Sequence, residues 1–188
     1  MIGEGESETV LLSSQMFRCL LSDKQISFVS KVINAGGKGN LLNNQLDGFI
    51  YQLIEKGATH ILILTDYDNA PCFTSIKEKV QSHIKSDIEI LIIIPKKELE
   101  AWFIACKETM KLITGTNSGS RNPENIDNPF KYIMTAMNKS RQRKSTFSKP
   151  ALAKKFLDRG FTITRASENK ECPSAAYFLK KITALGST

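Results

Sequence analysis

The sequence predicts an α/β fold: a mostly parallel sheet with helices on both faces, followed by a helical C-terminal extension. Strand-like and helix-like segments alternate through residue 94, which is the pattern of a parallel sheet with crossover helices. Two strand-like segments, Ile61–Leu64 and Ile88–Ile94, are almost continuously apolar and rich in β-branched residues, as expected of strands covered on both faces. After residue 94 the apolar spacing is helical only.

The alternating half is expected to hold three helices and three strands. The segment from Leu42 to Leu53 carries apolar residues at helical spacing. Pro71 stands where the first turn of a helix tolerates proline. The expected elements are, in order, a helix over 7–22, a strand over 25–33, a helix over 41–57, a strand over 61–65, a helix over 71–85 and a strand over 88–94.

The second half is expected to be helical. A helix over 97–114 is followed by a polar loop over 115–128. We expect an α/β domain over residues 1–114 and a basic helical extension over residues 115–188, packed on the same domain. The further helices in the extension are expected over 129–138, 150–158 and 173–184.

Charge is distributed unevenly along the chain. The 188 residues carry a net charge of +7, yet residues 131–188 hold thirteen Lys and Arg against three Asp and Glu. The preceding residues hold thirteen against sixteen. An acidic half joined to a basic half suits a polyanion held by the basic part. A solvated basic surface is the alternative interpretation.

Composition argues against several function classes. The sequence contains no signal peptide and no membrane-spanning run, so we expect a cytoplasmic protein without a membrane partner. The four cysteines lack the paired spacing of a zinc site, and scattered thiols suit a reducing compartment. With two histidines, the chain has little material for catalysis or metal binding built on imidazole.

Two carboxylates, Asp66 and Asp68, directly follow the strand expected over 61–65. In open α/β sheets, ligands bind just beyond the carboxyl ends of the strands. Two carboxylates two residues apart at that place suit a hard divalent cation such as Mg²⁺. The alternative is a turn in which one Asp caps the next helix.

Two further carboxylates, Glu98 and Glu100, follow the next strand and should reach the same edge of the sheet. At helical spacing they flank an apolar stripe, so one of them can point easily at a metal held by the aspartates. Acidic residues in the first turn also interact favourably with the helix dipole, which is the structural alternative. Trp102, within the apolar stripe, is assigned to the core.

The segment Glu4–Glu8, taken together with Asp66 and Asp68, resembles the signature of the Toprim fold. The resemblance implies a Toprim-like (Rossmann-like) sheet in which Glu4 and the two aspartates hold Mg²⁺, or Mn²⁺ in its place, to cut phosphodiester bonds. Helix-start chemistry with Ser7 as the N-cap is the alternative interpretation of the first segment. Three residues precede Glu4, so the first strand is either very short or truncated at its start.

A second resemblance narrows the family. Pro95–Phe103 and Cys172–Phe178 are similar to segments of the RloB-like proteins, which are Toprim-like relatives of the OLD-type nucleases. Such proteins are often encoded beside an ATPase of the SMC/ABC type in bacterial defence loci. The resemblance implies phage defence with an ATPase partner. A second metal ion would use Glu8, Glu98 or Glu100, and Glu100 would join the catalytic carboxylates.

The expected contacts to nucleic acid are basic residues in three places. Lys38 lies in the glycine-rich loop Gly36–Gly39, where backbone N–H groups can approach a phosphate, although a plain turn explains the glycines as well. Phe147, beside the densest basic cluster, would stack on a base or anchor its own loop. The candidate nucleic-acid-binding residues are Lys38, Lys96, Lys97, Arg141, Arg143 and Lys144.

The sequence therefore predicts Mg²⁺-dependent cleavage of the phosphodiester backbone of DNA or RNA. Two alternatives stay open. The first is a catalytically inactive Toprim-like subunit that docks on the ATPase. The second is a phosphatase of the haloacid dehalogenase type, in which a strand also ends in two such aspartates, although there it is the first strand. Each of these is compatible with a homo-oligomer.

Overall fold

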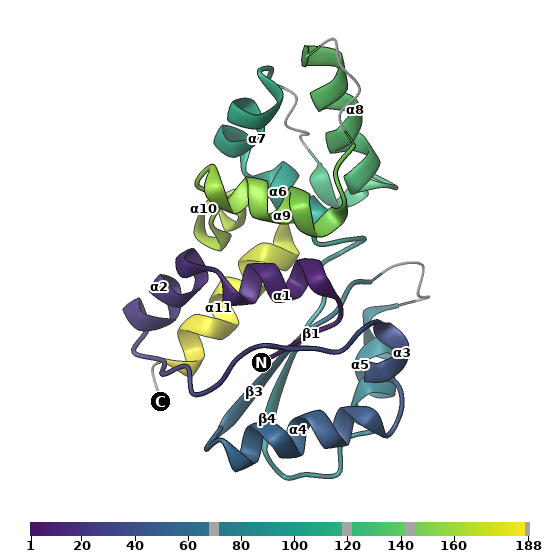
Figure 1. The fold of residues 1–188 in the computed structure, drawn as a ribbon, viewed down its shortest axis with the longest axis vertical. Coiled ribbons are helices and arrows are strands. Elements are labelled where there is room, and N and C mark those ends of the chain that lie inside the picture. Colours follow the sequence, from purple (N-terminus) through teal and green to yellow (C-terminus); the bar gives the residue numbers. More distant parts are fainter. Residues whose placement is uncertain (68–71, 118–121, 142–145, 187–188) are drawn as a thin grey trace.

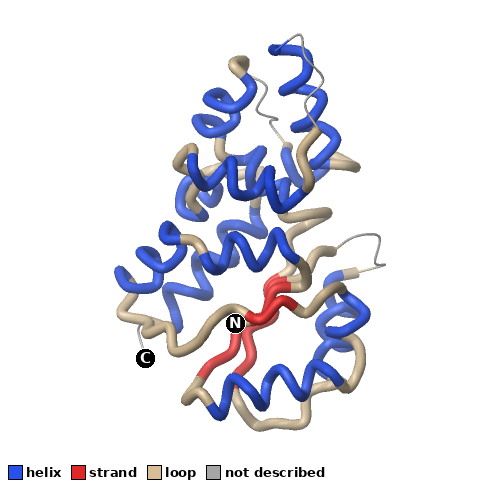
Figure 2. Tube along the Cα trace, in the orientation of Figure 1, coloured by secondary structure: helices blue, strands red, loops and turns tan. Residues whose placement is uncertain are grey.

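The sheet has four strands, all parallel, in the spatial order β2-β1-β3-β4. The computed structural model describes residues 1–67, 72–117, 122–141 and 146–186. The predicted fold class is confirmed: helices cover both faces of a parallel, Rossmann-like sheet (Figures 1 and 2). The strands are β1 (Ile2–Gly3), β2 (Ile33–Asn34), β3 (His60–Leu64) and β4 (Glu89–Ile93).

Alternate residues of β3 enter two separate cores, which explains its continuous apolar run. Ile61 and Ile63 pack on one face, under α4 (Gln45–Glu55) and α5 (Phe73–Gln81). Leu62 and Leu64 pack on the other face, among the remaining large helices. Successive side chains of a strand point to opposite faces, so both faces of this strand must be covered. The short helix α3 (Lys38–Leu41) precedes α4.

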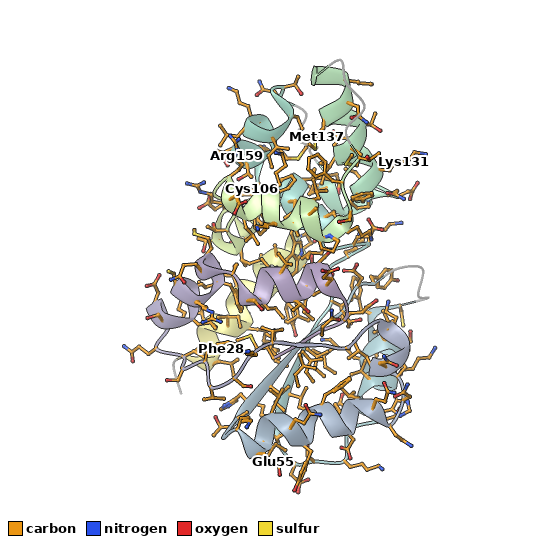
Figure 3. The ribbon with its side chains drawn as sticks, in the orientation of Figure 1. Phe28, Glu55, Cys106, Lys131, Met137 and Arg159 are labelled. Atoms are coloured by element: carbon orange, nitrogen blue, oxygen red, sulfur yellow. The ribbon has the colours of Figure 1, made fainter. Side chains whose placement is uncertain are left out.

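The second face carries a large helical body, whose core is continuous with Leu62 and Leu64 of β3. Stacked rings connect its helices: Phe103 lies 4.7 Å from Phe156, and Trp102 lies 5.3 Å from Phe178, between ring centroids. Figure 3 labels Cys106, which is fully buried in this body. Its helices are α1 (Glu6–Ser13), α2 (Gln15–Asp23), α6 (Glu100–Ala105), α7 (Lys107–Thr114), α8 (Pro129–Arg141), α9 (Lys149–Asp158), α10 (Ile163–Ser167) and α11 (Pro173–Leu185), with a 3₁₀ turn at Pro123–Asn125.

This core joins the two halves of the sequence. Leu11 and Phe17 from the first half share it with Phe156 and Phe178 from the second. Phe17 stacks on Phe178 at 5.8 Å between ring centroids. In Figure 1 helices α1 and α11 lie between the sheet and helices α6 to α10. The division into two domains at residue 114 stays a prediction. Among the described residues, one apolar core contains side chains from both sides of that position.

The central strand β1 is very short, with two residues. Ile2 pairs with Ile33 on one side and with Ile63 on the other. Helix α1 passes so close above it that a β-carbon on Gly3 would lie 2.9 Å from the backbone nitrogen of Thr9. Glycine is therefore required at this position for the first strand and the first helix to approach each other.

Three of the predicted elements are wrong in detail. The strand expected over 25–33 pairs only at its end, because β1 offers two residues to pair with. The helix expected over 7–22 is broken at Ser14, whose hydroxyl accepts a hydrogen bond from the backbone of Phe17 and caps α2. Similarly, the helix over 97–114 is interrupted at Cys106. Helix α10 was not expected.

Within the described ranges, no helix combines the length and the apolar character that crossing a lipid bilayer requires.

Candidate active site

The predicted carboxylates gather at the carboxyl edge of the sheet. Glu4 follows β1, Asp66 follows β3 after one residue, and Glu98 and Glu100 follow β4. Glu8 joins them from the first turn of α1. This convergence follows from the parallel topology, because the carboxyl ends of neighbouring parallel strands meet at one edge.

Glu4 is tied directly to the end of β3. Its Oε2 accepts hydrogen bonds from the backbone N–H of Asp66 at 3.0 Å and from the hydroxyl of Thr65 at 2.5 Å. Its own backbone N–H donates to the carbonyl of Leu64 at 2.9 Å, which extends the ladder beyond β1. Its carboxylate is therefore held in place by two donors although its strand is short.

Lys38 lies beside the same pair of residues. Its Nζ donates to the backbone carbonyl of Asp66 at 2.5 Å and lies 3.8 Å from Oε2 of Glu4. The glycine-rich loop permits this, because Gly37 adopts a φ of 121° and its N–H donates to the carbonyl of Glu4 at 2.8 Å. The loop between β2 and α3 thus brings a cation to the acidic edge of the sheet.

Asp66 links β3 to the segment after β4. Its side chain is buried and Oδ1 accepts a hydrogen bond from the backbone N–H of Leu99 at 2.9 Å. Burial raises the pKa of Asp66 well above its usual value. The negative charges of Glu8, Glu100 and Glu4 raise the same pKa further, which shows that the four carboxylates lie within electrostatic range.

Glu8 and Glu100 are the other buried carboxylates of the site. Oε2 of Glu8 accepts a hydrogen bond from the backbone N–H of Gly5 at 3.0 Å, and burial raises its pKa. Glu100 is 1% exposed, and neither of its carboxylate oxygens has a hydrogen-bond partner among the described residues. Burial raises the pKa of Glu100 to about 7. A buried carboxylate without a donor is costly, so this group needs an explanation.

Lys149 supplies positive charge to the site, and sequence analysis did not assign it there. Its Nζ lies 2.9 Å from Oε1 of Glu98 and 3.9 Å from Oε2 of Glu100. Partial burial lowers the pKa of Lys149, but the charges of these two glutamates outweigh that effect and the pKa is raised. One signal was available: Lys149 is the first residue of α9, where a cation opposes the helix dipole.

Lys96 and Lys97, the other lysines predicted to contact phosphate, lie near the same edge. Each contacts a residue outside the carboxylate cluster. Nζ of Lys96 donates to the side chain of Asn125 at 3.3 Å, and Nζ of Lys97 pairs with Asp127 at 3.2 Å. Phe147 is partly buried against the core, with Nζ of Lys155 5.4 Å from its ring centroid, which favours the anchoring interpretation. Asp68, Arg143, Lys144 and the side chain of Arg141 lie outside the described residues.

The carboxylates of the site suit a divalent cation by their chemistry. Their arrangement among the described residues suits such an ion less well. Clustered carboxylates with raised pKa values, one of them without a hydrogen-bond donor, are what a cation with oxygen ligands would relieve. However, in the described parts of the chain no three or more His, Cys, Asp or Glu side chains form a group that could hold a metal ion. With Asp68 outside those parts, the Mg²⁺ site stays a prediction.

Comparisons with known proteins give a family match without a described activity. The model of the family called "Domain of unknown function (DUF4276)" matches residues 3–183. No curated protein and no solved structure matches the chain significantly. The matched range contains the whole carboxylate cluster and Lys149.

Proposed function

Because the chain belongs to the DUF4276 family, whose description names no activity, we propose its function from the site itself: Mg²⁺-dependent hydrolysis of phosphodiester bonds in nucleic acid, with Mn²⁺ able to replace Mg²⁺. One observation carries the proposal. Carboxylates from three strand ends and from α1 converge at the carboxyl edge of the sheet. Those of Asp66, Glu8 and Glu100 are buried, and Glu100 lacks any hydrogen-bond donor in the described residues. Structural carboxylates are normally paired.

The residues that would hold the cation are Glu4 and Asp66, together with Asp68 and with Glu8 or Glu100. The bound cation would lower the pKa of a water molecule and offset charge on the leaving oxygen. In the reaction water adds to phosphorus, the bond to one ester oxygen breaks, and that oxygen gains a proton. Thr65 and the backbone of Leu99 fix the orientation of Glu4 and Asp66.

Two lysines are suited to contact the phosphate. Lys38 and Lys149 lie at opposite sides of the carboxylate cluster, one beside Glu4 and the other beside Glu98 and Glu100. An ammonium group held by carboxylates stays charged, so it is available to offset the negative charge of the scissile phosphate. The excess of basic residues over 131–188 supports a polyanionic substrate.

The biological setting belongs to the proposal as well. We infer a cytoplasmic enzyme of phage defence that acts beside an SMC/ABC-type ATPase, on the resemblance of Pro95–Phe103 to RloB-like proteins. The four free thiols are in keeping with a reducing compartment. The contact between Glu4 and Asp66 at 3.0 Å supports the Toprim-like interpretation, because these motif residues are 62 positions apart.

A non-catalytic subunit that docks on the ATPase is the second candidate. The observation in its favour is Lys149, which already offsets part of the charge of Glu98 and Glu100. Because this lysine already offsets part of the negative charge, the protein depends less on a metal ion to keep the carboxylates together in the folded state. The two candidates differ in whether phosphodiester bonds are cut.

Cleavage assays on plasmid DNA and on structured RNA, with Mg²⁺ or Mn²⁺ and with or without the ATPase, test the proposal. We expect cleavage by the wild type and its loss in Asp66→Asn and Glu4→Gln, both of which keep the shape of the side chain. Asp127→Asn is the matched control, since its carboxylate is 99% exposed and pairs with Lys97 away from the cluster. Full activity in Glu4→Gln would remove the proposed mechanism, and an inactive wild type with its partner present would favour the docking subunit.

A further inference from the structure

A cavity lies at the same edge of the sheet as the carboxylates and has no role in the chemistry above. It has a volume of about 350 Å³, and its walls come from α5, the segment after β4, the 3₁₀ turn and the start of α11. That volume is within the range of about 300–1,000 Å³ that is typical of small-ligand sites. The residues that carry the argument are Phe73, Lys77, Lys96, Glu124, Ser174 and Tyr177.

Exposed aromatic rings distinguish this cavity from the rest of the surface. Among the described residues, the exposed aromatic side chains are Tyr51, Phe73 and Tyr177, and two of these three line the one cavity. Phe73 is 38% exposed and Tyr177 is 39% exposed. Large rings left open to solvent in one hollow, and not scattered singly, mark a binding surface.

The rings are joined physically to the carboxylate cluster. Phe73 packs on Tyr67 with 4.4 Å between ring centroids, and Tyr67 is the residue next to Asp66. The backbone N–H of Tyr67 donates to the carbonyl of Pro95 at 3.2 Å, so the same short segment borders both places. A ligand on Phe73 would therefore be a near neighbour of a phosphate at the carboxylates.

The cavity is rich in positive charge. Nζ of Lys77 lies 3.4 Å from the hydroxyl of Tyr177 and 5.2 Å from its ring centroid, and Nζ of Lys181 lies 5.6 Å from the same centroid. Lys77 and Lys96 line the cavity itself, Lys181 lies beside it, and Nζ of Lys96 also donates to Asn125. One wall residue is acidic, but Oε1 of Glu124 accepts a hydrogen bond from the backbone N–H of Ser174 at 2.8 Å, at the start of α11. The helix dipole there offsets part of its charge.

We propose that this cavity is a subsite for an unpaired nucleobase, so that the substrate of the site is single-stranded nucleic acid. Open aromatic faces bind bases by stacking whatever their identity, and flanking lysines bind the backbone phosphates. A base inside a duplex has both faces covered by its neighbours and cannot enter. The inference rests on the proposed function in naming the substrate, but base binding itself needs no metal and no cleavage.

Fluorescence anisotropy in EDTA tests the inference without any cleavage. The probe is a fluorescein-labelled oligodeoxythymidylate, compared with the same strand annealed to oligodeoxyadenylate. We expect tighter binding to the single strand, and a loss of roughly 5- to 150-fold in that affinity for Tyr177→Ala and for Phe73→Ala, since stacking contributes that much per base. Tyr177→Phe keeps the ring and should bind as the wild type does. Tyr51→Ala, which removes an exposed ring from α4 that does not line this cavity, is the matched control.

The outcomes separate this inference from the proposed function. Equal affinities of the wild type, Tyr177→Ala and Phe73→Ala for the single strand would overturn the subsite, as would equal losses for the duplex or no binding to either probe. Selective loss for the single strand supports the subsite even if the wild type cuts nothing, in which case the proposed hydrolysis fails and base binding stands. Cleavage of the single strand at the wild-type rate by both variants would leave the hydrolysis and reject the subsite.

Discussion

Glu100 is the residue whose environment departs furthest from what a folded protein normally tolerates. Its carboxyl group is 1% exposed and has no donor among the described residues, and Nζ of Lys149 lies 3.9 Å from its Oε2. Folding therefore favours the protonated form of this side chain, because removing a charge from water without a partner is unfavourable. The pH of the solution and the presence of a cation should both act on stability through this one residue.

The first prediction concerns the pH dependence of stability. The pKa of Glu100 rises from 4.5 to about 7 on folding, so the folded state binds a proton more tightly than the unfolded state between these values. The free energy of unfolding in EDTA should therefore fall by about 3 kcal/mol as the pH rises from about 5 to about 8. The raised pKa values of Asp66 and Glu8 act with the same sign. Urea denaturation followed by Trp102 fluorescence measures the change.

Glu100→Gln is the matched variant for that experiment, because it has the same shape and does not titrate. Its stability should depend less on pH over the same window. Adding Mg²⁺ near pH 8 should raise the free energy of unfolding of the wild type, because the ion binds the ionised folded form. If wild type and variant have the same slope, burial of Glu100 is not what links stability to pH.

The second prediction concerns Lys149. Lys149→Met removes the ammonium group and leaves Glu98 and Glu100 without its charge. Because the lysine side chain is 41% exposed, we expect a loss of about 1–3 kcal/mol near pH 8, less than for a fully buried pair. The loss should shrink near pH 5, where Glu100 is protonated. Lys154→Met, at an exposed position of the same helix, should change stability by less than about 0.5 kcal/mol.

At this scale the sequence predicted the acidic half of the site and missed its cation. Asp66 and Glu4 could be placed because each follows a strand, and parallel strands bring such positions together. Lys149 could not, because its partner Glu98 is 51 residues away and the contact depends on how α9 packs. Side-chain contacts across that separation are set by tertiary packing, which local patterns do not encode.

At the scale of elements, the close approach of β1 and α1 positions Glu4 and Glu8 on either side of one turn. The strand contributes two residues, so its hold on the sheet comes from pairing on both of its edges. The shortness of β1 also explains why the strand predicted over 25–33 pairs only at its end. Ile26, Phe28 and Val32 have the alternation of a strand and pack on the core, but β1 leaves them no partner for a ladder. Phe28, labelled in Figure 3, is covered instead by the guanidinium of Arg18 at 5.1 Å.

The third prediction tests that close approach. Gly3→Ala would place a β-carbon 2.9 Å from the backbone nitrogen of Thr9 and 3.0 Å from the β-carbon of Glu8. We expect a loss of about 1–3 kcal/mol in the free energy of unfolding, since the backbone must move to admit it. Cleavage should fall as well, because Glu4 follows directly. Gly48→Ala in α4 meets nothing within 4 Å and should gain about 0.5–1 kcal/mol. Equal stabilities of the two variants would show that the contact is not tight.

At the scale of the whole molecule, the sheet and the helical body are held by one continuous apolar core on one face of the sheet. The rings of Trp102, Phe103, Phe156 and Phe178 come from both halves of the sequence. The fold class could be predicted because alternation of strands and helices admits few topologies. The path of the later helices could not, since amphipathic helices show which face is buried but not which neighbour covers it.

The fourth prediction is that the chain unfolds as one cooperative unit. Trp102, the single tryptophan, is a fully buried residue of α6 that stacks on Phe178 of α11, so its fluorescence reports on both halves. Its unfolding midpoint should coincide with that of far-ultraviolet circular dichroism. Phe156→Ala should lower both midpoints together, at a cost of about 3–5 kcal/mol. A shift in the circular dichroism signal alone, or two separate transitions, would mean that residues 115–188 fold independently.

The order in which the chain is made gives the pairing of Lys149 with Glu98 and Glu100 a further consequence. Ribosomes release the acidic residues first, and the lysine 51 residues after Glu98. Before Lys149 has been made, a folding chain would bring the carboxylates together at one edge of the sheet without that counterion. The repulsion between their charges opposes early closure of this edge. Contacts of such sequence separation form late in folding. The carboxylate cluster is thus expected to close only after residue 149 has been made, so a shorter nascent chain does not yet hold the assembled cluster.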